Sequence, residues 1–452
     1  MKKNHNIIQA PENLNVYTEV KKKWGFLKHN TARVEIPGTT QMMNDTKGRE
    51  VLASLKHVDI TYGSGSKAFR AVTDMNLNIY KGEVLGLVGE SGSGKSTTGK
   101  ALVGLNNYSF GEIKLLDKVL PKKLSRGFKY GKSLKEYKEI EQFVINKVQM
   151  IFQDPANSLN PHVNVKAVVS EGLYNTKNAK EIYLYNQDQR VFAEIYKSLH
   201  KFNPDVYNKD FFDKTNVQLN IDSITAFKVL YEDLFEKVSK EISDSQVLEY
   251  FRNEKNKREI ESNWSEAQCR DILVIDILKS VGLDESVLKR FPLEFSGGQQ
   301  QRIGISRSVI LRPELLVADE PISALDVSIQ AQVVNIFNDL KDKYNLTILF
   351  IAHDLRMVEY ISDRIAVMNK GVLLEVGKTE EIVKNPIHPY TRSLLDAVPS
   401  IESIKTSLIK SLYDPSIHNY SDEVQPEWIK VADEHYVLGT KEEVQEWINT
   451  SK

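Results

Sequence analysis

The chain has 452 residues, 41% of them hydrophobic, and its 60 Lys and Arg residues nearly balance 61 Asp and Glu residues, for a formal net charge of -1. This length exceeds one ordinary domain and allows either two compact units or one large domain with insertions. The balanced charge argues against a nucleic-acid-binding surface. The single cysteine, Cys269, excludes an intramolecular disulfide and a cysteine-rich metal site, as is typical of a reducing cytosolic compartment.

The sequence predicts neither a membrane-spanning helix nor a signal peptide. No stretch approaches the roughly 18–20 apolar residues that a spanning helix needs, and residues 1–6 lack an apolar core like that of a signal peptide. Any membrane role is therefore expected to come from a partner. Residues 1–50 are polar and predict a partly ordered N-terminal extension. Residues 21–23 are all lysine and lie beside Trp24 and Phe26, which leaves open a weak contact with a membrane surface.

Two strands joined by a turn are predicted next. Apolar residues recur from Val51 to Ile60, which favours a strand. A glycine- and serine-rich turn follows at residues 61–66, and a second strand is expected at residues 72–79. Tyr62 precedes the next motif by about the distance that lets an aromatic ring reach a nucleotide base, although a half-buried structural tyrosine fits the composition equally well.

The most informative stretch is residues 89–97, GESGSGKST, which we call the phosphate loop. It follows the apolar run Val84–Val88, which predicts a buried strand, and precedes a helix that we expect to end near Gly104. In this context G-x-x-x-x-G-K-[ST] predicts phosphate binding. Glycines let backbone N–H groups surround an anion, and the helix dipole adds positive charge. Lys95 supplies charge for the β- and γ-phosphates, and the Ser96 hydroxyl can hold Mg²⁺; a flexible surface loop is the alternative.

A charged segment interrupts the strand pattern after the phosphate loop. Residues 111–116 predict a strand, and the run from Lys118 to Lys147 is rich in lysine, which is typical of a solvated face or loop. Order is expected to return at residues 148–152, an apolar strand that Pro155 stops.

Residues 175–268 form the largest block without a catalytic motif. Apolar residues recur at helical spacing within residues 192–199 and 227–238, with a helix breaker at residues 203–204. We expect at least two or three amphipathic helices there. Their apolar stripes predict a small helical core rather than a ligand-binding box.

Three further apolar runs, at residues 315–318, 347–352 and 364–368, predict buried strands. A helix is expected at residues 327–341, where apolar side chains follow one stripe. Strands that alternate with helices favour βαβ units. We therefore expect an α/β fold with a largely parallel sheet.

Two carboxylates, Asp319 and Glu320, follow the first of these three runs. In a phosphate-loop protein the first is suited to hold Mg²⁺, through water or Ser96, and the second to orient and polarise a water molecule. A capping pair in a turn is the alternative. His353 follows the second run, where ligands bind in open α/β sheets, and a neutral histidine there could hydrogen-bond a γ-phosphate or the attacking water; a structural histidine is the alternative.

A second helix start carries an anion-binding pattern. Ser296 and Gln299 are spaced as a capping box, and Gly297 and Gly298 leave the N–H groups of the first turn exposed. Two phosphate-binding helix starts in one chain indicate that two copies pair and that each contributes half of a site.

In order and spacing these motifs closely resemble those of the nucleotide-binding subunits of ATP-binding cassette transporters, over about residues 51–175 and 270–400. The matches are residues 89–96 with the Walker A loop, Gln153 with the Q-loop, residues 296–299 with the signature motif, Asp319 and Glu320 with the Walker B aspartate and catalytic glutamate, Asp326 with the D-loop, and His353 with the switch histidine. The resemblance implies a P-loop ATPase core, with a mostly parallel sheet and an antiparallel β subdomain, plus a helical subdomain with a large helical insertion.

The resemblance also implies residue roles. Glu320, His353 and Gln153 are expected to be catalytic, and Ser96, Gln153 and Asp319 to hold Mg²⁺. The residues expected to bind ATP are Tyr62, Gly89, Glu90, Ser91, Gly92, Ser93, Gly94, Lys95, Ser96, Thr97, Ser296, Gly297, Gly298, Gln299 and Asp326. Among these, Tyr62 falls where the family stacks an aromatic ring on adenine.

Residues 149–161, 323–332 and 385–391 are similar to the oligopeptide/dipeptide permease ATPases, nearer to the F-type subunit than to its D-type partner. This implies an ATPase subunit of an oligopeptide importer, peripheral on the cytoplasmic face of the cell membrane. The expected partners are a second ATPase subunit of D-type in a heterodimer, two transmembrane permease subunits and an extracellular substrate-binding protein, with no nucleic acid. Dipeptide, nickel or glutathione are alternative substrates.

The predicted domains are an N-terminal extension at residues 1–50, an ATPase domain at 51–400 and a C-terminal extension of oligopeptide-permease type at 401–452. The helical subdomain is expected at about 155–312, with an insertion at about 176–268 that makes it roughly 75 residues longer than is usual in the family. The C-terminal extension has no cysteine, which rules out the iron–sulfur cluster that some relatives carry.

Two other functions remain open at this point. A cassette ATPase that works without a membrane is one, although such proteins usually carry two cassettes or long coiled coils, and this chain has one of each motif and no sustained heptads. A regulatory protein with a degenerate nucleotide site is the other. The insertion is either a docking or regulatory surface or a tolerated surface elaboration.

Overall fold

A computed structural model describes residues 15–23, 27–124, 127, 129–242, 245–396, 413–418, 420–421 and 424–450. The chain divides into a first unit, Met1–Pro155 with Pro313–Lys452, and a second unit, Ala156–Arg312. Trp24 and Phe26 lie outside the described residues, so the predicted membrane-surface contact stays a prediction.

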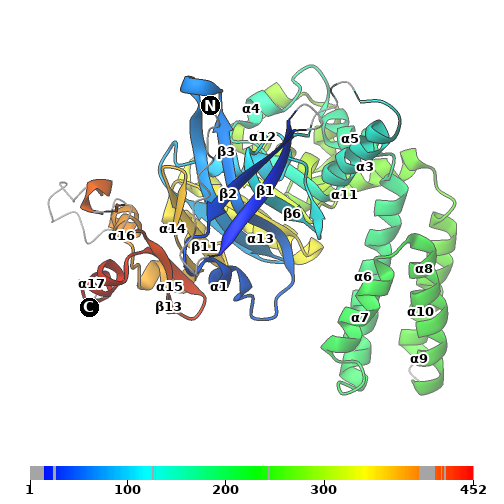
Figure 1. Ribbon diagram of the computed structural model, residues 1–452. Coiled ribbons are helices and arrows are strands. Elements are labelled where there is room, and N and C mark those ends of the chain that lie inside the picture. The colour runs from blue at the N-terminus through cyan, green and yellow to red at the C-terminus, as the bar shows by residue number, and fades with distance from the viewer. Residues whose placement is uncertain are drawn as a thin grey trace. The chain divides into compact units, whose positions relative to one another are not determined.

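The first unit (Figure 1) contains an eight-stranded sheet with the strand order β13-β14-β12-β11-β5-β10-β9-β8. Its strands are β5 (Val84–Val88), β8 (Val148–Ile151), β9 (Leu315–Asp319), β10 (Thr347–Ala352), β11 (Arg364–Asn369), β12 (Val372–Lys378), β13 (Glu427–Ala432) and β14 (His435–Gly439). The five strands from β11 to β8 are parallel, and the other three pair antiparallel. Every residue of β5, β9, β10 and β11 is buried, as the apolar runs predict.

A four-stranded antiparallel sheet, in the order β4-β3-β6-β7, is the second sheet of this unit. Its strands are β3 (Val51–Tyr62), β4 (Phe69–Tyr80), β6 (Phe110–Leu115) and β7 (Lys118–Val119). The hairpin of β1 (Val16–Lys23) and β2 (Leu27–Val34) is bound to it by charged side chains. Glu19 accepts a hydrogen bond from the Gly111 N–H at 2.7 Å, and Arg33 pairs with Asp59 and Asp74. The described part of the N-terminal segment therefore packs on this sheet.

Helices flank the two sheets of the first unit. They are α1 (Thr39–Asn44), α2 (Lys95–Leu102), α3 (Gly131–Lys147), α13 (Val327–Tyr344), α14 (Leu355–Glu359), α15 (Thr379–Lys384), α16 (Pro389–Asp396) and α17 (Lys441–Thr450), with short helices η1 (Gly65–Lys67) and η6 (Pro415–Ile417). One apolar core takes in residues of both sheets, among them Ile60, Leu87 and Val317. The predicted α/β fold, with a mostly parallel sheet and an antiparallel β subdomain, is confirmed.

The lysine-rich run before β8 is partly a helix, α3, and not only a solvated face or loop as expected. Ile140, Phe143 and Val144 recur at helical spacing and pack against the apolar core. The charged face stays exposed, with pairs such as Lys132 and Glu136 four residues apart. These few apolar residues are scattered among many lysines, so the sequence shows no clear apolar face of a helix in this run.

The second unit is helical in its described residues. Its helices are α4 (Pro155–Ser158) at the unit boundary, α5 (Val165–Thr176), α6 (Ala179–Phe202), α7 (Lys209–Leu219), α8 (Ser223–Phe227), η2 (Lys228–Leu234), α9 (Phe235–Glu241), α10 (Ser245–Glu261), α11 (Glu266–Ser280), η3 (Glu285–Lys289), η4 (Pro292–Glu294) and α12 (Gly297–Val309). α6 ends just before the predicted breaker, and α6 and α10 lie side by side (Figure 1). Across the described part of the chain, no helix is long and apolar enough to cross a bilayer.

The predicted core of the insertion is confirmed, and it also contains an ion pair. Phe192, Leu230 and Phe251 belong to one buried apolar cluster. Beside it, Arg258 of α10 donates to both carboxylate oxygens of Asp188 of α6, at 2.8 and 3.0 Å. The two side chains are 3% and 1% exposed, and burial raises the pKa of Asp188. Because a buried charge is costly unless it is paired, this contact specifies how α6 and α10 pack.

Asp188→Ala is expected to lower the free energy of unfolding of the insertion by about 3–5 kcal/mol, because Arg258 would keep a buried, uncompensated charge. Hydrogen exchange of the amides in α6 and α10 measures this. Asp210→Ala is the control, since Asp210 and Lys214 form an exposed pair that is worth about 1 kcal/mol or less. Equal losses in the two variants would contradict the prediction.

Candidate functional site

The carboxyl ends of parallel strands bring the predicted site residues to one edge of the eight-stranded sheet. β5 leads into the phosphate loop, β9 into Glu320, and β10 into His353. Ile351 of β10 pairs with both Leu87 of β5 and Asp319 of β9. Neighbouring parallel strands therefore end together, as they do where ligands bind in open α/β sheets.

Two glycines let the phosphate loop fit against the chain around it. Gly89 has φ +152, and a Cβ there would lie 2.1 Å from the Met368 carbonyl oxygen. Gly94 has φ +100, and a Cβ there would lie 2.8 Å from the Ala71 carbonyl oxygen. Since α2 begins at the next residue, Lys95, the backbone N–H groups of a helix start lie at the loop, as anion binding requires.

Lys95 is held within the phosphate loop by main-chain oxygens. Its Nζ donates to the carbonyl oxygens of Gly89 and Glu90 at 2.7 and 2.8 Å, and to Ser93 Oγ at 3.4 Å. Burial lowers the pKa of Lys95, while Glu320 and Asp319 oppose that shift. The ammonium group is thus preorganised by weak neutral acceptors that an anionic phosphate can replace.

Ser96 and Asp319 bring two oxygen ligands together. Ser96 Oγ donates to Asp319 Oδ1 at 2.6 Å, and burial raises the pKa of Asp319. Hydroxyl and carboxylate oxygens are hard ligands, and Mg²⁺ typically takes one or two protein groups together with water and phosphate oxygens. The donor set therefore fits Mg²⁺ bound with a nucleotide.

Glu320 is the centre of a second polar group. Its Oε2 accepts a hydrogen bond from Gln153 Nε2 at 2.9 Å and lies 3.7 Å from His353 Nδ1. The backbone of Glu320 has φ +46, and its N–H donates to the Ile351 carbonyl oxygen at 3.0 Å. The main chain thus turns sharply after β9 and directs this carboxylate toward Gln153 and His353.

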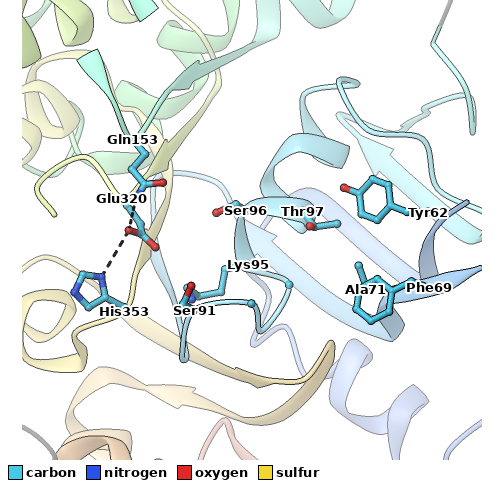
Figure 2. Close-up of a pocket in the computed structure, with 12 residues that line it drawn as sticks. Tyr62, Phe69, Ala71, Ser91, Lys95, Ser96, Thr97, Gln153, Glu320 and His353 are labelled. Carbon is cyan, nitrogen blue, oxygen red and sulfur yellow. Dashed lines mark hydrogen bonds and ion pairs between the residues drawn. The ribbon is translucent and has the colours of Figure 1, made fainter. Parts of the chain in front are cut away.

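Most of these side chains, though not that of Asp319, face one cavity of about 550 Å³. Its lining residues are Tyr62, Phe69, Ala71, Ser91, Gly92, Gly94, Lys95, Ser96, Thr97, Gln153, Glu320 and His353. Figure 2 shows Gln153, Glu320 and His353 on one side of the phosphate loop and Tyr62 and Phe69 on the other. The cavity therefore has a polar side with a carboxylate and an aromatic side.

The aromatic side is built by strand pairing. Tyr62 of β3 is directly opposite Phe69 of β4, and the two side chains are 45% and 65% exposed. Asn106 Nδ2 donates to the Tyr62 hydroxyl at 2.8 Å, which fixes that ring. Two exposed rings, one of them fixed by a hydrogen bond, suit stacking on a planar base.

The other predicted site residues are not among those that line this cavity. Asp326 is exposed at the N-terminus of α13 and is not one of the lining residues. Ser296 belongs to the second unit, where it caps α12. Its Oγ accepts from the Gln299 N–H at 3.4 Å, and Gln299 Oε1 accepts from the Ser296 N–H at 3.2 Å. The predicted capping box is confirmed.

Phe69 and Ala71 are lining residues that the sequence patterns do not indicate. Phe69 could have been found only from its pairing opposite Tyr62. The register of β3 and β4 shifts at several points, so the sequence does not show which residues are paired. Tyr390 touches the phosphate loop without lining the cavity: its hydroxyl accepts from the Glu90 N–H at 2.8 Å. Tyr390 lies in residues 385–391, which the sequence analysis found similar to the permease ATPases without assigning them a role.

Comparison with known proteins finds two family models and several curated relatives that match this chain. Residues 72–323 match the family model "ABC transporter", and residues 374–419 match "Oligopeptide/dipeptide transporter, C-terminal region". The chain is 37% identical to the oligopeptide transport ATP-binding protein AmiF of Streptococcus pneumoniae, over 87% of this chain and 97% of AmiF. It is 36% identical to OppF, the oligopeptide transport ATP-binding protein of Bacillus subtilis, over 87% and 98%.

The dipeptide transport ATP-binding protein DppF of Lactococcus lactis is 37% identical, over 87% of this chain and 96% of DppF. Among solved structures, a post-hydrolysis dimer of the ATP-binding cassette MJ0796 with ADP and Pi matches at 19% identity and a TM-score of 0.46, over 73% of this chain and 99% of that one. The family model over residues 72–323 and the similarity to AmiF, OppF and DppF over 87% of this chain identify the same family. The chain belongs to the ABC transporter family and is one of its ATP-hydrolysing subunits.

Proposed function

We propose that this chain is the ATP-binding and ATP-hydrolysing F-type subunit of an importer for oligopeptides, which it powers through separate membrane subunits. The observation that carries the ATPase role is the cavity that Lys95, Ser96 and Glu320 line together. The substrate class is supported by the names of the relatives AmiF and OppF and by the match of residues 374–419. Dipeptides are the second candidate, because DppF is equally similar.

The nucleotide lies along the cavity from its aromatic side to its polar side. Tyr62 stacks on the adenine, with Phe69 beside it. The backbone N–H groups of the phosphate loop that face the cavity surround the phosphates, and Lys95 exchanges its carbonyl partners for β- and γ-phosphate oxygens. Ser96, Asp319 and Gln153 hold Mg²⁺. Bound there, Mg²⁺ neutralises phosphate charge.

Hydrolysis needs a water molecule aligned with the γ-phosphate. Glu320 accepts a proton from that water as it attacks phosphorus, and the bond to ADP breaks. Gln153 and His353 orient the Glu320 carboxylate and the water, consistent with their 2.9 and 3.7 Å separations from Oε2. These three residues are the catalytic group of this proposal.

The site is shared between two ATPase subunits. The capped helix start at Ser296, Gly297, Gly298 and Gln299 serves the γ-phosphate of ATP bound to a D-type partner, and the partner's signature helix closes over this chain's ATP. Asp326 lies near that interface. Closure and reopening then drive two permease subunits, supplied with substrate by an extracellular binding protein. The chain works as a peripheral protein on the cytoplasmic face of the membrane.

Lys95→Ala is expected to weaken ATP binding by at least about tenfold, because it removes a charge-assisted hydrogen bond to phosphate. Equilibrium binding of MgATP to the purified chain measures the change. The control is Lys81→Ala, since Lys81 is exposed and paired with Glu50 at 3.3 Å. Equal affinity in the two variants would refute the assigned site.

Glu320→Gln is expected to keep ATP binding and to lower the rate of hydrolysis by about 10²-fold or more, because the general base is lost. The assay uses the assembled transporter with a partner subunit that also lacks its catalytic glutamate. Glu50→Gln serves as the surface control. A normal rate in the doubly substituted complex would sink the proposed mechanism.

Deletion of residues 178–265 tests the insertion, which has its own buried core. We expect ATP binding, complex assembly and peptide uptake to survive, because a tolerated surface elaboration contributes nothing to the shared site. Uptake by cells and co-purification with the permease subunits measure this. Loss of either, with ATP binding intact, would instead assign the insertion a docking role.

A further inference from the structure

A tyrosine far along the chain contacts the phosphate loop. Tyr390, in α16, is fully buried, and its hydroxyl accepts a hydrogen bond from the Glu90 N–H at 2.8 Å. Neither residue lines the nucleotide cavity. The contact therefore supports the loop from outside the site, and leaves the cavity itself to the nucleotide.

Glu90 links this tyrosine to the lysine of the site. While its N–H donates to Tyr390, its carbonyl oxygen accepts from Lys95 Nζ at 2.8 Å. A second support is the hydrogen bond from the Gly371 N–H to the Ser93 carbonyl oxygen at 3.0 Å. The N–H and the carbonyl group of Glu90 belong to the same short turn. A shift of the Tyr390 hydroxyl would therefore also displace the Glu90 carbonyl oxygen, which positions the Lys95 ammonium group.

Tyr390 is in turn held by a buried polar network. The Glu375 carboxylate, which is fully buried, accepts from the Ile387 and His388 N–H groups at 2.9 and 3.1 Å. Its Oε1 also lies 2.7 Å from Nε2 of His435, in β14. His388 Nδ1 accepts from the Tyr390 N–H at 3.1 Å, and burial lowers the pKa of His388 to about 3. The imidazole is therefore neutral and able to accept at neutral pH.

Aromatic rings from the end of the chain complete this support. The Tyr390 ring packs on Tyr413 with centroids 5.2 Å apart, and the His388 ring packs on Trp447 of α17 at 5.0 Å. β14 itself extends the eight-stranded sheet beside β12. In the described residues that follow the parallel strands, these contacts hold the Tyr390 hydroxyl against the phosphate loop.

We propose that Tyr390 is a positioning residue for the phosphate loop, through which the C-terminal region sets the affinity of this subunit for the phosphates of its nucleotide. This inference rests on the proposed function, in which that loop binds ATP. Removal of the hydroxyl leaves the Glu90 N–H without its acceptor and lets the turn that contains Glu90 take up other conformations, so the nucleotide has to order the loop when it binds. Base stacking on Tyr62 does not depend on this contact.

The test is Tyr390→Phe in the full chain. A lost hydrogen bond of ordinary strength predicts that the dissociation constants for MgATP and MgADP rise about three- to tenfold. The dissociation constant for AMP, which has no β-phosphate for the loop to hold, is expected to change by less than about twofold. In the assembled transporter, the same variant raises KM for ATP more than it lowers kcat.

The matched control is Tyr108→Phe. Tyr108 is buried in the same unit, and its hydroxyl donates to the Leu120 carbonyl oxygen at 2.5 Å, so this variant also loses a buried hydroxyl without touching the loop. If Tyr390→Phe and Tyr108→Phe bind MgATP and MgADP alike while Lys95→Ala loses binding, the inference fails and the proposed function stands. If Lys95→Ala also binds normally, the proposed function itself fails.

Hydrogen exchange in the unmodified chain provides a test that needs no variant to fold. The Glu90 amide is expected to be protected before nucleotide is added, and ADP is expected to add protection mainly at residues 91–96. Rapid exchange of the Glu90 amide in the nucleotide-free chain would overturn the inference.

Discussion

The parallel pairing of β5, β10 and β9 is the constraint on which the candidate site depends. Ile351 of β10 is in register with Leu87 on one side and Asp319 on the other. A slip of two residues in either pair would move Glu320 away from Lys95 by about 7 Å. Since these strands are wholly buried, their apolar packing fixes the register, and the polar chemistry at the strand ends follows from it.

Two kinds of support act on the phosphate loop. On the cavity side, carbonyl oxygens hold Lys95 in place of a ligand. Outside the cavity, Gly371 and Tyr390 bind the same turn through its main chain. A loop built from glycines has much backbone entropy to lose on ordering, so contacts that order it before the nucleotide arrives lower that cost of binding.

The strands and the site motifs could be predicted from sequence because their signals are local. Buried parallel strands appear as continuous apolar runs, and the phosphate loop, the Ser296–Gln299 box and the Asp319–Glu320 pair are defined by neighbours in the chain. The remaining features depend on long-range contacts. Tyr390 meets Glu90 across 300 positions and Arg258 meets Asp188 across 70, and Phe69 gains its place from irregular strand pairing. No pattern of neighbouring residues carries such information.

The backbone of Glu320 sets folding stability against the contacts of its side chain. A non-glycine residue with φ +46 sits in a left-handed conformation that costs roughly 1 kcal/mol or more, whereas glycine adopts it freely. Folding stability and chemistry therefore favour different residues at this position. Only glycine would relieve this conformation, and glycine would remove the carboxylate that Gln153 contacts, so the backbone at this position stays strained for as long as the carboxylate is kept.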